Sequence, residues 1–361
     1  MKFRFFPLIA AGTFATALFA LTGPASGAET VKTFILVGQS NMQGKGSVFT
    51  MNHMIKDPRT KATFAALHDG KGHYKTRDDV YINFLEKRGK LTVGYGSGED
   101  WIGPELGFGW TVGDAIAEPV LIIKAAYGGR SLYRDFRPSS AGLPADGVLQ
   151  QELEQAQKRT RQRNEQRNQD NPIPTMEDIK SRYGFAYRDM MGEVANVRDN
   201  YQTLFPELKG KKLDVAGVVW FQGWNDMINP EFTAAYTETM KHVINDVRRD
   251  IGDPDLPFII GQLGVGGPYV GDDPGKDKKE VFKANQAAAA EGMKNVAVVK
   301  TDQFWDPVAA EKYENWRDDI DEWRKYGNDH GYHYLGSPLI VYRIGKAFGE
   351  KMLELTGEAA N

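Results

Sequence analysis

The sequence contains no cysteine among its 361 residues. This absence excludes disulfide bonds, thiolate nucleophiles, iron–sulfur clusters and cysteine-ligated zinc. A strong charge of one sign is also missing, because 45 Lys and Arg residues nearly balance 48 Asp and Glu residues. A protein that holds nucleic acid through bulk charge needs a basic surplus, so we expect no nucleic-acid partner. With 41% hydrophobic residues, the chain can build an ordinary packed core.

Signatures of nucleotide binding are missing as well. The glycine-rich stretches 94–98 and 261–267 have neither the dinucleotide-binding spacing nor the Gly-Lys-Ser/Thr ending of a phosphate-binding loop. We therefore expect the protein to work without a cofactor.

Long hydrophobic runs are scarce, and the one clear example lies at the N-terminus. Lys2 and Arg4 precede an apolar stretch over 5–21, and small residues follow it. This order is typical of a secretory signal peptide, so we predict a signal over 1–28 and a mature chain over 29–361. The alternative is a transmembrane anchor, although the run is at the lower end of the roughly 17–25 residues that span a bilayer. An exported protein without disulfides is typical of the bacterial periplasm or of the bacterial exterior. We expect the mature protein to be free of the membrane once the signal peptide is cleaved.

Short apolar runs rich in β-branched residues alternate with longer segments of helical character. Most of the short runs are continuously apolar, which is typical of strands covered on both faces. We expect strands over 33–37, 80–85, 120–124, 215–221, 257–263 and 296–300. We expect helices over 107–117, 184–204, 230–251 and 278–292, and a last amphipathic helix over 344–355. The alternation predicts an α/β fold, a three-layer α/β/α sandwich around a mainly parallel, flavodoxin-like central sheet.

One polar stretch interrupts this alternation. Residues 149–171 are rich in Gln, Glu, Arg and Asn, and Pro172 and Pro174 follow them. Such a composition is typical of a solvated surface. We therefore predict a single domain over 29–361 that carries an exposed helical or mobile insertion over about 149–180.

The most informative motif is Gly-Gln-Ser-Asn-Met, residues 38–42, directly after the first expected strand. Open α/β sheets bind ligands at the carboxyl ends of their strands, where Ser40 would lie. If a helical turn begins after Ser40, its free backbone N–H groups can bind developing negative charge. Ser and Asn are also favoured helix caps, so this motif alone leaves a capping role open.

Two further motifs follow expected strands. Phe-Gln-Gly-Trp-Asn-Asp, residues 221–226, offers the side-chain amide of Asn225 as a donor to an oxyanion. Tyr-Gly-Gly-Arg-Ser, residues 127–131, offers an exposed backbone N–H near Gly129. Each motif is also compatible with a plain turn, which Gly, Asn and Asp favour.

A histidine motif, Asn-Asp-His-Gly-Tyr-His at 328–333, precedes the last expected helix. Histidine is the usual general base for a serine nucleophile, because its pKa lies near neutrality. A surface or packed histidine is the plainer alternative, and metal binding by His330 and His333 is another. No acidic third ligand lies at a recognised spacing, so we expect no metal.

Four residues of these motifs follow one another along the chain: Ser40, Gly129, Asn225 and His333. Their order resembles that of the sequence blocks of the SGNH (GDSL-like) hydrolase superfamily. The Gly-Gln-Ser-Asn-Met motif resembles more specifically the sialate O-acetylesterase and carbohydrate acetylesterase branch, which includes acetylxylan esterases. The stretch 103–109 and the His-Tyr-Leu-Gly-Ser ending at 333–337 are also similar to that branch. The resemblance runs from about residue 31 to residue 355.

The resemblance implies a serine esterase that removes O-acetyl groups from carbohydrates through an acyl-enzyme. It makes Ser40 the nucleophile and His333 the base that deprotonates it. It also implies an oxyanion hole made of the Ser40 and Gly129 backbone N–H groups and the Asn225 side chain. Such a set of groups is suited to acyl transfer.

The chain departs from the usual final block, which places the acid three residues before the histidine. Here His330 occupies that position, and Asp329 lies four residues before His333. We choose Asp329 as the acid, because geometry and not sequence position defines such groups. Asp302, Asp306 and a Ser–His dyad remain alternatives.

Four side chains near these motifs are expected to contact an acetylated carbohydrate substrate: Gln39, Gln222, Trp224 and Arg130. Arg130, Arg134 and Arg137 follow the glycine motif, and we hypothesise that they face an anionic sugar, because Arg matches planar anions. Trp224 departs from the branch's usual third block, which leaves the exact sugar open.

Two other classes of function stay open. One is a non-catalytic glycan-binding protein on the same fold, since fold does not determine function. The other is a lipid or thioester hydrolase of the wider superfamily, although the sequence has no apolar lid segment. The oligomeric state is also open.

Overall fold

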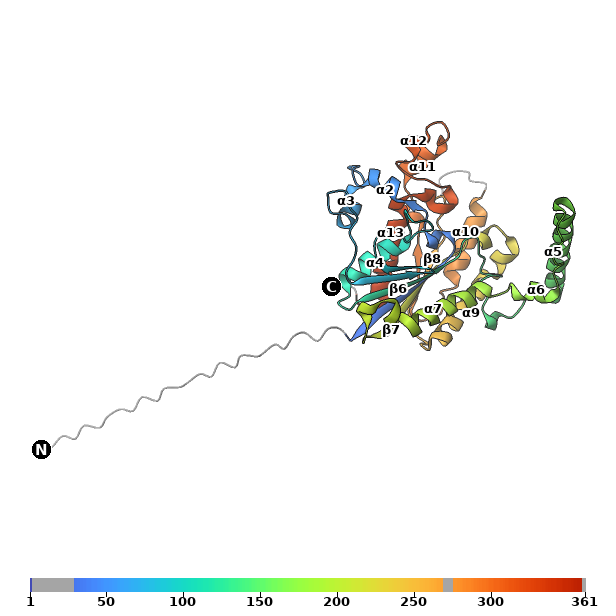
Figure 1. Cartoon of the computed structure of the whole chain (residues 1–361), viewed down its shortest axis with the longest axis horizontal. Helices are drawn as coiled ribbons and strands as arrows, with labels where there is room; N and C mark the ends of the chain where they lie inside the picture. The colour runs from blue at the N-terminus through green and yellow to red at the C-terminus, as the bar shows by residue number, and fades with distance from the viewer. Residues whose placement is uncertain (2–28, 269–274, 359–361) are drawn as a thin grey trace.

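The computed structural model describes Met1 and residues 29–268 and 275–358. A sheet crosses the middle of the molecule, and helices lie on both of its faces (Figure 1). The predicted signal peptide lies outside the described residues apart from its first. Within the described ranges, no helix is both long enough and apolar enough to cross a membrane.

Nine strands are described in two sheets: β1 (Thr30–Gly38), β2 (Gly46–Ser47), β3 (Val80–Phe84), β4 (Lys87–Lys90), β5 (Trp101–Ile102), β6 (Val120–Ala126), β7 (Lys212–Phe221), β8 (Phe258–Gln262) and β9 (Val296–Lys300). The larger sheet has the order β4-β3-β6-β1-β7-β8-β9, and β2 pairs with β5. Within the larger sheet, every pair is parallel except the β3–β4 hairpin at its edge.

The prediction of an α/β fold with a mainly parallel sheet is therefore confirmed. All six expected strands are present, with bounds that differ by a few residues. The edge strand β4 was not expected, because its sequence Lys-Arg-Gly-Lys has no apolar pattern. An edge strand exposed to water needs no such pattern, and its charges oppose pairing with other chains.

Five longer helices cover the sheet: α4 (Pro104–Ala115), α7 (Phe185–Leu204), α9 (Pro230–Ile251), α10 (Lys276–Ala288) and α13 (Pro338–Thr356). Successive side chains of a strand point to opposite faces. Trp220 of β7 contacts Tyr236 of α9, whereas its neighbour Phe221 contacts Phe348 of α13. Helices α4 and α13 thus pack on one face and α7, α9 and α10 on the other, as in a three-layer sandwich.

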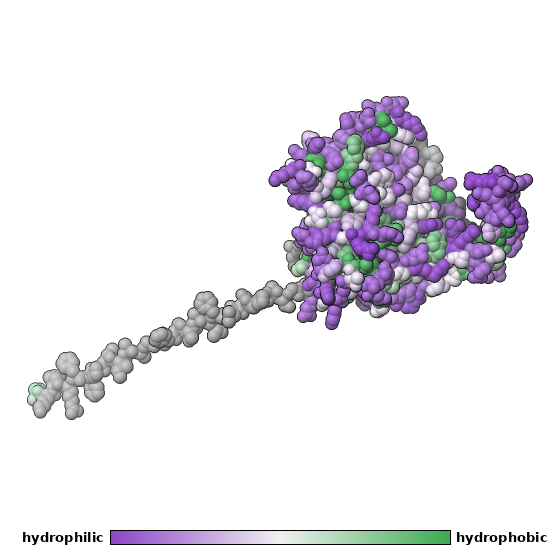
Figure 2. Space-filling view, in the orientation of Figure 1, coloured by the Kyte–Doolittle hydropathy of each residue, from purple (hydrophilic) through white to green (hydrophobic). Residues whose placement is uncertain are grey.

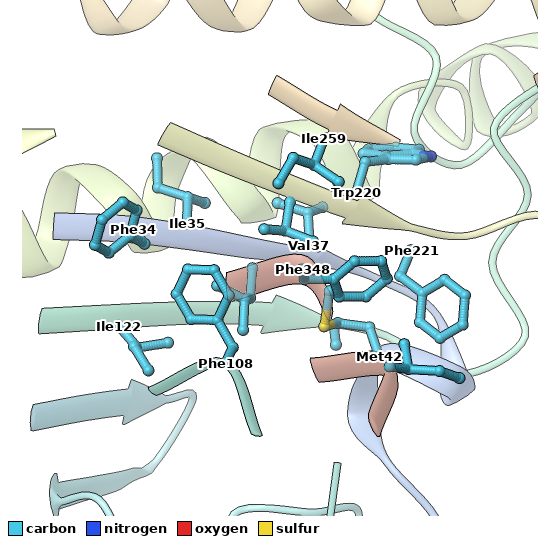
Figure 3. Close-up of a cluster of buried hydrophobic side chains, with 14 of the residues drawn as sticks. Phe34, Ile35, Val37, Met42, Phe108, Ile122, Trp220, Phe221, Ile259 and Phe348 are labelled. Carbon is cyan, nitrogen blue, oxygen red and sulfur yellow. The ribbon is translucent and has the colours of Figure 1, made fainter. Parts of the chain in front are cut away.

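Figure 3 shows part of the apolar core on both faces of the sheet. Phe34 of β1 and Phe108 of α4 meet edge to face, with ring centroids 5.3 Å apart. Met42, which follows Ser40 in the chain, is completely buried beside Phe221. The turn after β1 is therefore anchored in the core, and the position of Ser40 is tied to the sheet.

The remaining helices are shorter or more peripheral: α1 (Ser40–Gln43), α2 (Val48–Met54), α3 (Lys61–Phe64), α5 (Asp146–Arg167), α6 (Met176–Ser181), α8 (Trp224–Met227), α11 (Pro307–Glu314) and α12 (Ile320–Trp323). Helix α5 projects from the domain, and Figure 2 shows it covered with hydrophilic residues. Of its described residues, Leu149 alone is buried. The assignment of this region as an insertion in a single domain stays a prediction.

Candidate active site

Ser40 is buried at the carboxyl end of β1, where it begins the single turn of α1. Position 38, two residues before Ser40, requires glycine because β1 and β7 approach each other closely there. A Cβ atom at Gly38 would lie 2.1 Å from the carbonyl oxygen of Phe221, which is far inside van der Waals contact. The Ser40 backbone N–H is at the start of the helix, and it has no acceptor within 29–268 and 275–358.

His333 lies in a tight loop, η5 (Gly331–Gly336), just before α13. The next two residues, Tyr334 and Leu335, have φ angles of 52° and 63°. Side chains rarely tolerate this left-handed region, and such strain persists only where surrounding contacts enforce it. The Tyr334 hydroxyl provides these contacts, since it accepts the Gly264 N–H at 2.8 Å and bonds to the Thr301 hydroxyl at 2.5 Å.

The loop brings His333 and Asp329 to Ser40, which is distant in the chain. His333 Nε2 lies 2.9 Å from Ser40 Oγ, and His333 Nδ1 lies 3.0 Å from Asp329 Oδ2. The second contact has the length of an ion pair, but the ring N–H is not aligned for a good hydrogen bond. The other Asp329 oxygen accepts the backbone N–H of His330 at 2.6 Å. With its proton on Nδ1, a neutral His333 can accept the Ser40 hydroxyl proton at Nε2.

The electrostatics of Asp329 suit this arrangement. Burial would raise the pKa of the Asp329 carboxyl, but the close contact with the His333 ring and the hydrogen bond from the His330 backbone outweigh it and hold that pKa below its usual value. The carboxylate is therefore charged at neutral pH.

The two alternative carboxylates are engaged elsewhere. Asp302 Oδ2 pairs with Lys283 Nζ at 2.7 Å. Both carboxylate oxygens of Asp306 lie 2.9 Å from Arg59 Nη1 and accept its hydrogen bonds. Asp306 also caps the start of α11. Within the described part of the chain, neither carboxylate contacts the His333 ring.

Gly129 and Asn225 lie side by side near Ser40. Asn225 Nδ2 donates one hydrogen bond to the Gly129 carbonyl at 3.1 Å, which leaves its second N–H for another acceptor. Gln39, the residue before Ser40, donates to Asn225 Oδ1 at 3.2 Å and so orients the amide. Gly129 has a φ of 70°, which favours glycine, and its N–H has no acceptor among the residues described.

Gln39 and Gln222 lie beneath the site, and each is only 1% exposed. Gln39 Oε1 accepts hydrogen bonds from the Gly223 N–H at 3.1 Å and the Gln222 amide at 3.3 Å. Both side chains are buried and bonded within the protein, which argues against a contact with substrate, and the expectation of that contact stays a prediction. Their amides connect the ends of β1 and β7.

Asp226 is not among the site residues expected from the sequence, where its place after Asn225 indicated only a turn. It is fully buried, and it accepts the backbone N–H groups of Leu132 at 2.8 Å and Tyr133 at 2.9 Å. Burial raises the pKa of this carboxyl to about 7, although hydrogen bonds favour its charged form. Asp226 thereby ties the loop that carries Gly129 to the turn that carries Asn225.

The three arginines after the glycine motif have different environments. Arg137 donates to three backbone carbonyls, and Arg134 pairs with Asp135 at 3.3 Å. The half-buried Arg130 lies over the ring of Phe185 at 4.7 Å and forms no ion pair with any described residue. Three of the five N–H donors of Arg137 are therefore used within the protein, and the hypothesis of an anion-binding face stays a prediction.

His330 and Trp224 lie beside the group formed by Ser40, His333 and Asp329. His330 Nδ1 bonds to the Tyr313 hydroxyl at 2.7 Å, and the Trp224 ring lies 5.4 Å from that of Tyr332. No group of three His, Asp or Glu side chains that could hold a metal ion occurs in the described ranges.

A serine, a histidine and a carboxylate in this contact, at the carboxyl edge of a parallel sheet, form the arrangement that serine hydrolases use. The chain matches the family model "Carbohydrate esterase, sialic acid-specific acetylesterase" over residues 30–169 and 181–307. The chain therefore belongs to this family of carbohydrate acetylesterases. The matched segments contain Ser40, Gly129 and Asn225, whereas Asp329 and His333 lie beyond them.

Solved structures give a likeness of fold. A protein from Arabidopsis thaliana is similar with a TM-score of 0.50 at 13% identity, over 91% of this chain and 98% of that one. A structure described as a novel carbohydrate acetylesterase from Xanthomonas citri has a TM-score of 0.47 at 14% identity, over 90% of this chain and 57% of that one. No curated protein sequence matches the chain.

Proposed function

We propose that the protein is an exported serine esterase that removes O-acetyl groups from carbohydrates. The observation that carries the proposal is the contact of Ser40 Oγ with His333 Nε2 at 2.9 Å, with Asp329 at 3.0 Å from the other ring nitrogen. Membership in the carbohydrate esterase family supports the class of substrate.

In the acylation step, Ser40 Oγ attacks the acetyl carbonyl carbon and its proton passes to His333 Nε2. The carbonyl oxygen becomes an oxyanion, which the Ser40 and Gly129 backbone N–H groups and the free N–H of Asn225 stabilise. When the tetrahedral intermediate collapses, the bond to the sugar oxygen breaks and His333 protonates that oxygen. The sugar leaves, and Ser40 carries the acetyl group.

In the deacylation step, water attacks the acetyl-serine while His333 takes its proton. The same donors stabilise the second oxyanion. Collapse breaks the bond to Ser40 Oγ, His333 returns the proton to it, and acetate leaves. Asp329 orients the imidazole and stabilises its cation in both steps.

The test is acetate release from acetylated xylan, pectin, sialate and algal glycans, with Ser40→Ala as the inactive variant. The protein offers a matched control, because Ser140 Oγ and His242 Nδ1 form an exposed Ser–His contact at 2.8 Å. A serine-directed phosphonate should label Ser40 and leave Ser140 unlabelled. Equal acetate release by wild type and Ser40→Ala would refute the proposal.

Two results would favour the other classes of function. An unlabelled Ser40 in a protein that still binds glycans would favour a non-catalytic glycan-binding protein. Rates that rise with acyl length beyond acetyl would favour a lipid or thioester hydrolase. Export is tested separately, by N-terminal sequencing of the mature protein, which should begin at Glu29.

A further inference from the structure

Next to His333 lies a surface hollow of about 280 Å³ that the proposed chemistry does not use. Aromatic rings form much of its wall: Trp224, Tyr313, His330 and Tyr332. This volume is just below the roughly 300–1,000 Å³ of sites for drug-sized ligands, so the hollow suits one small ring.

The rings of the hollow contact one another in a row. Trp224 and Tyr332 have ring centroids 5.4 Å apart at 35°, and Tyr332 and His330 have centroids 5.3 Å apart at 30°. Tyr332 is 37% exposed, which is high for an aromatic residue. Within the described part of the chain, the row therefore presents an aromatic surface to solvent.

The hollow is attached directly to the catalytic groups. The Tyr332 ring contacts the His333 ring edge to face with centroids 4.5 Å apart, and Asn41, next to Ser40, donates to the Tyr332 carbonyl at 3.2 Å. Trp224 immediately precedes Asn225 in the chain.

The proposed mechanism determines which part of the substrate lies here. His333 must protonate the leaving oxygen, so that oxygen lies within hydrogen-bond reach of Nε2. The alcohol part of the ester therefore lies beside the His333 ring, which the Tyr332 ring contacts. The acetyl group needs no such space, because it is held at Ser40 by the oxyanion donors.

The chemistry of the wall fits a sugar ring. The C–H-rich face of a pyranose can pack on aromatic rings, while its edge carries hydroxyl groups that need polar partners. The Tyr313 hydroxyl and the His330 imidazole, bonded to each other at 2.7 Å, supply such partners at the wall. The lining formed by described residues also includes Lys279 and no carboxylate.

We propose that this hollow is a subsite that binds the pyranose ring of the leaving sugar, chiefly against Trp224 and Tyr332, and so selects cyclic sugar acetates over acyclic esters. The proposal rests on the esterase function above, because only an esterase has a leaving sugar. It assigns the two aromatic residues to binding and not to the chemical steps.

The test compares an ester that contains a pyranose ring with an ester that does not. Monoacetates of methyl β-D-glucopyranoside carry a pyranose, whereas monoacetates of glucitol are acyclic polyol esters with similar hydroxyl groups. For the wild-type protein we expect kcat/KM to favour the pyranoside about tenfold, which corresponds to about 1.4 kcal/mol. The preference should appear mainly in KM, because stacking holds substrate and transition state alike.

Trp224→Leu and Tyr332→Leu should each lower the pyranoside-to-glucitol ratio of kcat/KM by threefold or more, about 0.7 kcal/mol. Tyr332→Phe keeps the ring and should keep the ratio. The matched control is Phe49→Leu, which removes an exposed aromatic ring outside the hollow and should leave both rates unchanged. A ratio is insensitive to a general loss of folded enzyme, which makes it the appropriate readout.

A second measurement needs no variant. Methyl β-D-glucopyranoside should inhibit wild-type hydrolysis of 4-nitrophenyl acetate competitively, and glucitol should not. Acetate release without ring preference, or a ratio unchanged in both leucine variants, would overturn the subsite and leave the esterase function standing. Absence of acetate release from either ester and from 4-nitrophenyl acetate would instead overturn the function, and the subsite with it.

Discussion

Replacement of Asp329 by Asn tests the electrostatics of the site most directly. Asn has nearly the same shape, and its amide oxygen can still accept the His330 N–H that Asp329 Oδ1 accepts at 2.6 Å. The substitution removes the negative charge 3.0 Å from His333 Nδ1. An amide N–H placed there also favours the tautomer with its proton on Nε2, which cannot accept the Ser40 proton.

The expected magnitude follows from the distance between Asp329 and His333. Two unit charges 3.0 Å apart interact by about 5.5 kcal/mol at an effective dielectric constant of about 20, and by about 1.4 kcal/mol in bulk water. The side chains of His333 and Asp329 are 18% and 17% exposed, so the effective dielectric constant around them lies between these two values. At about 1.4 kcal/mol per tenfold in rate, we expect Asp329→Asn to lower kcat about a thousandfold.

The assay is the steady-state hydrolysis of 4-nitrophenyl acetate, with thermal unfolding to verify that the variant is folded. The matched control is Asp302→Asn, because Asp302 pairs with Lys283 and does not contact His333. This control should keep kcat close to the wild-type value. If Asp329→Asn retained more than about a tenth of wild-type kcat, the imidazolium would gain no more than about 1.4 kcal/mol from the carboxylate. The site would then be a Ser–His dyad.

Three further predictions concern neighbouring groups. Asn225→Ala removes one oxyanion donor, worth about 3 kcal/mol, so kcat should fall about a hundredfold or more while thermal unfolding changes little. Because burial raises the pKa of Asp226 to about 7, the folded protein holds an extra proton between about pH 4 and 7. Its free energy of unfolding should therefore fall by up to ~4 kcal/mol as pH rises through that window. Urea unfolding at several pH values should find this slope in the wild type and not in Asp226→Asn. Gly38→Ala should displace the turn that holds Ser40, since its Cβ would lie 2.1 Å from the Phe221 oxygen. Its kcat should fall more than tenfold, and a wild-type kcat would contradict the close packing of β1 and β7.

The elements that the sequence predicts well are those with strong local patterns. The helix expected over 230–251 has the bounds of α9, because Asn229 caps it through its side chain and Pro230 begins its first turn. The buried strands were found because strands covered on both faces are continuously apolar. The hairpin strand β4 lacks any such pattern, and it forms because β3 offers it an edge.

The residues of the site, too, could be inferred from the sequence only in part. Ser40, Gly129 and Asn225 each follow a strand, so their common place at one edge of the sheet could be inferred from chain order. The burial of Gln39 and Gln222 could not, since a glutamine's sequence context does not tell whether its amide faces a ligand or another amide. The role of Asp226 was hidden for a similar reason, because its partners Leu132 and Tyr133 are more than 90 positions away.

The sequence by itself determined the class of fold, the order of the chemical groups and the resemblance to carbohydrate acetylesterases, because these depend on local pattern and motif. The sequence favoured Asp329 as the acid but left Asp302 and Asp306 open, and the tertiary structure shows that Asp329 lies against His333. That contact depends on two left-handed residues, Tyr334 and Leu335, which the Tyr334 hydroxyl holds in place through contacts with distant strand ends. A backbone strained by distant contacts has no local signature, so only the folded chain shows where it turns.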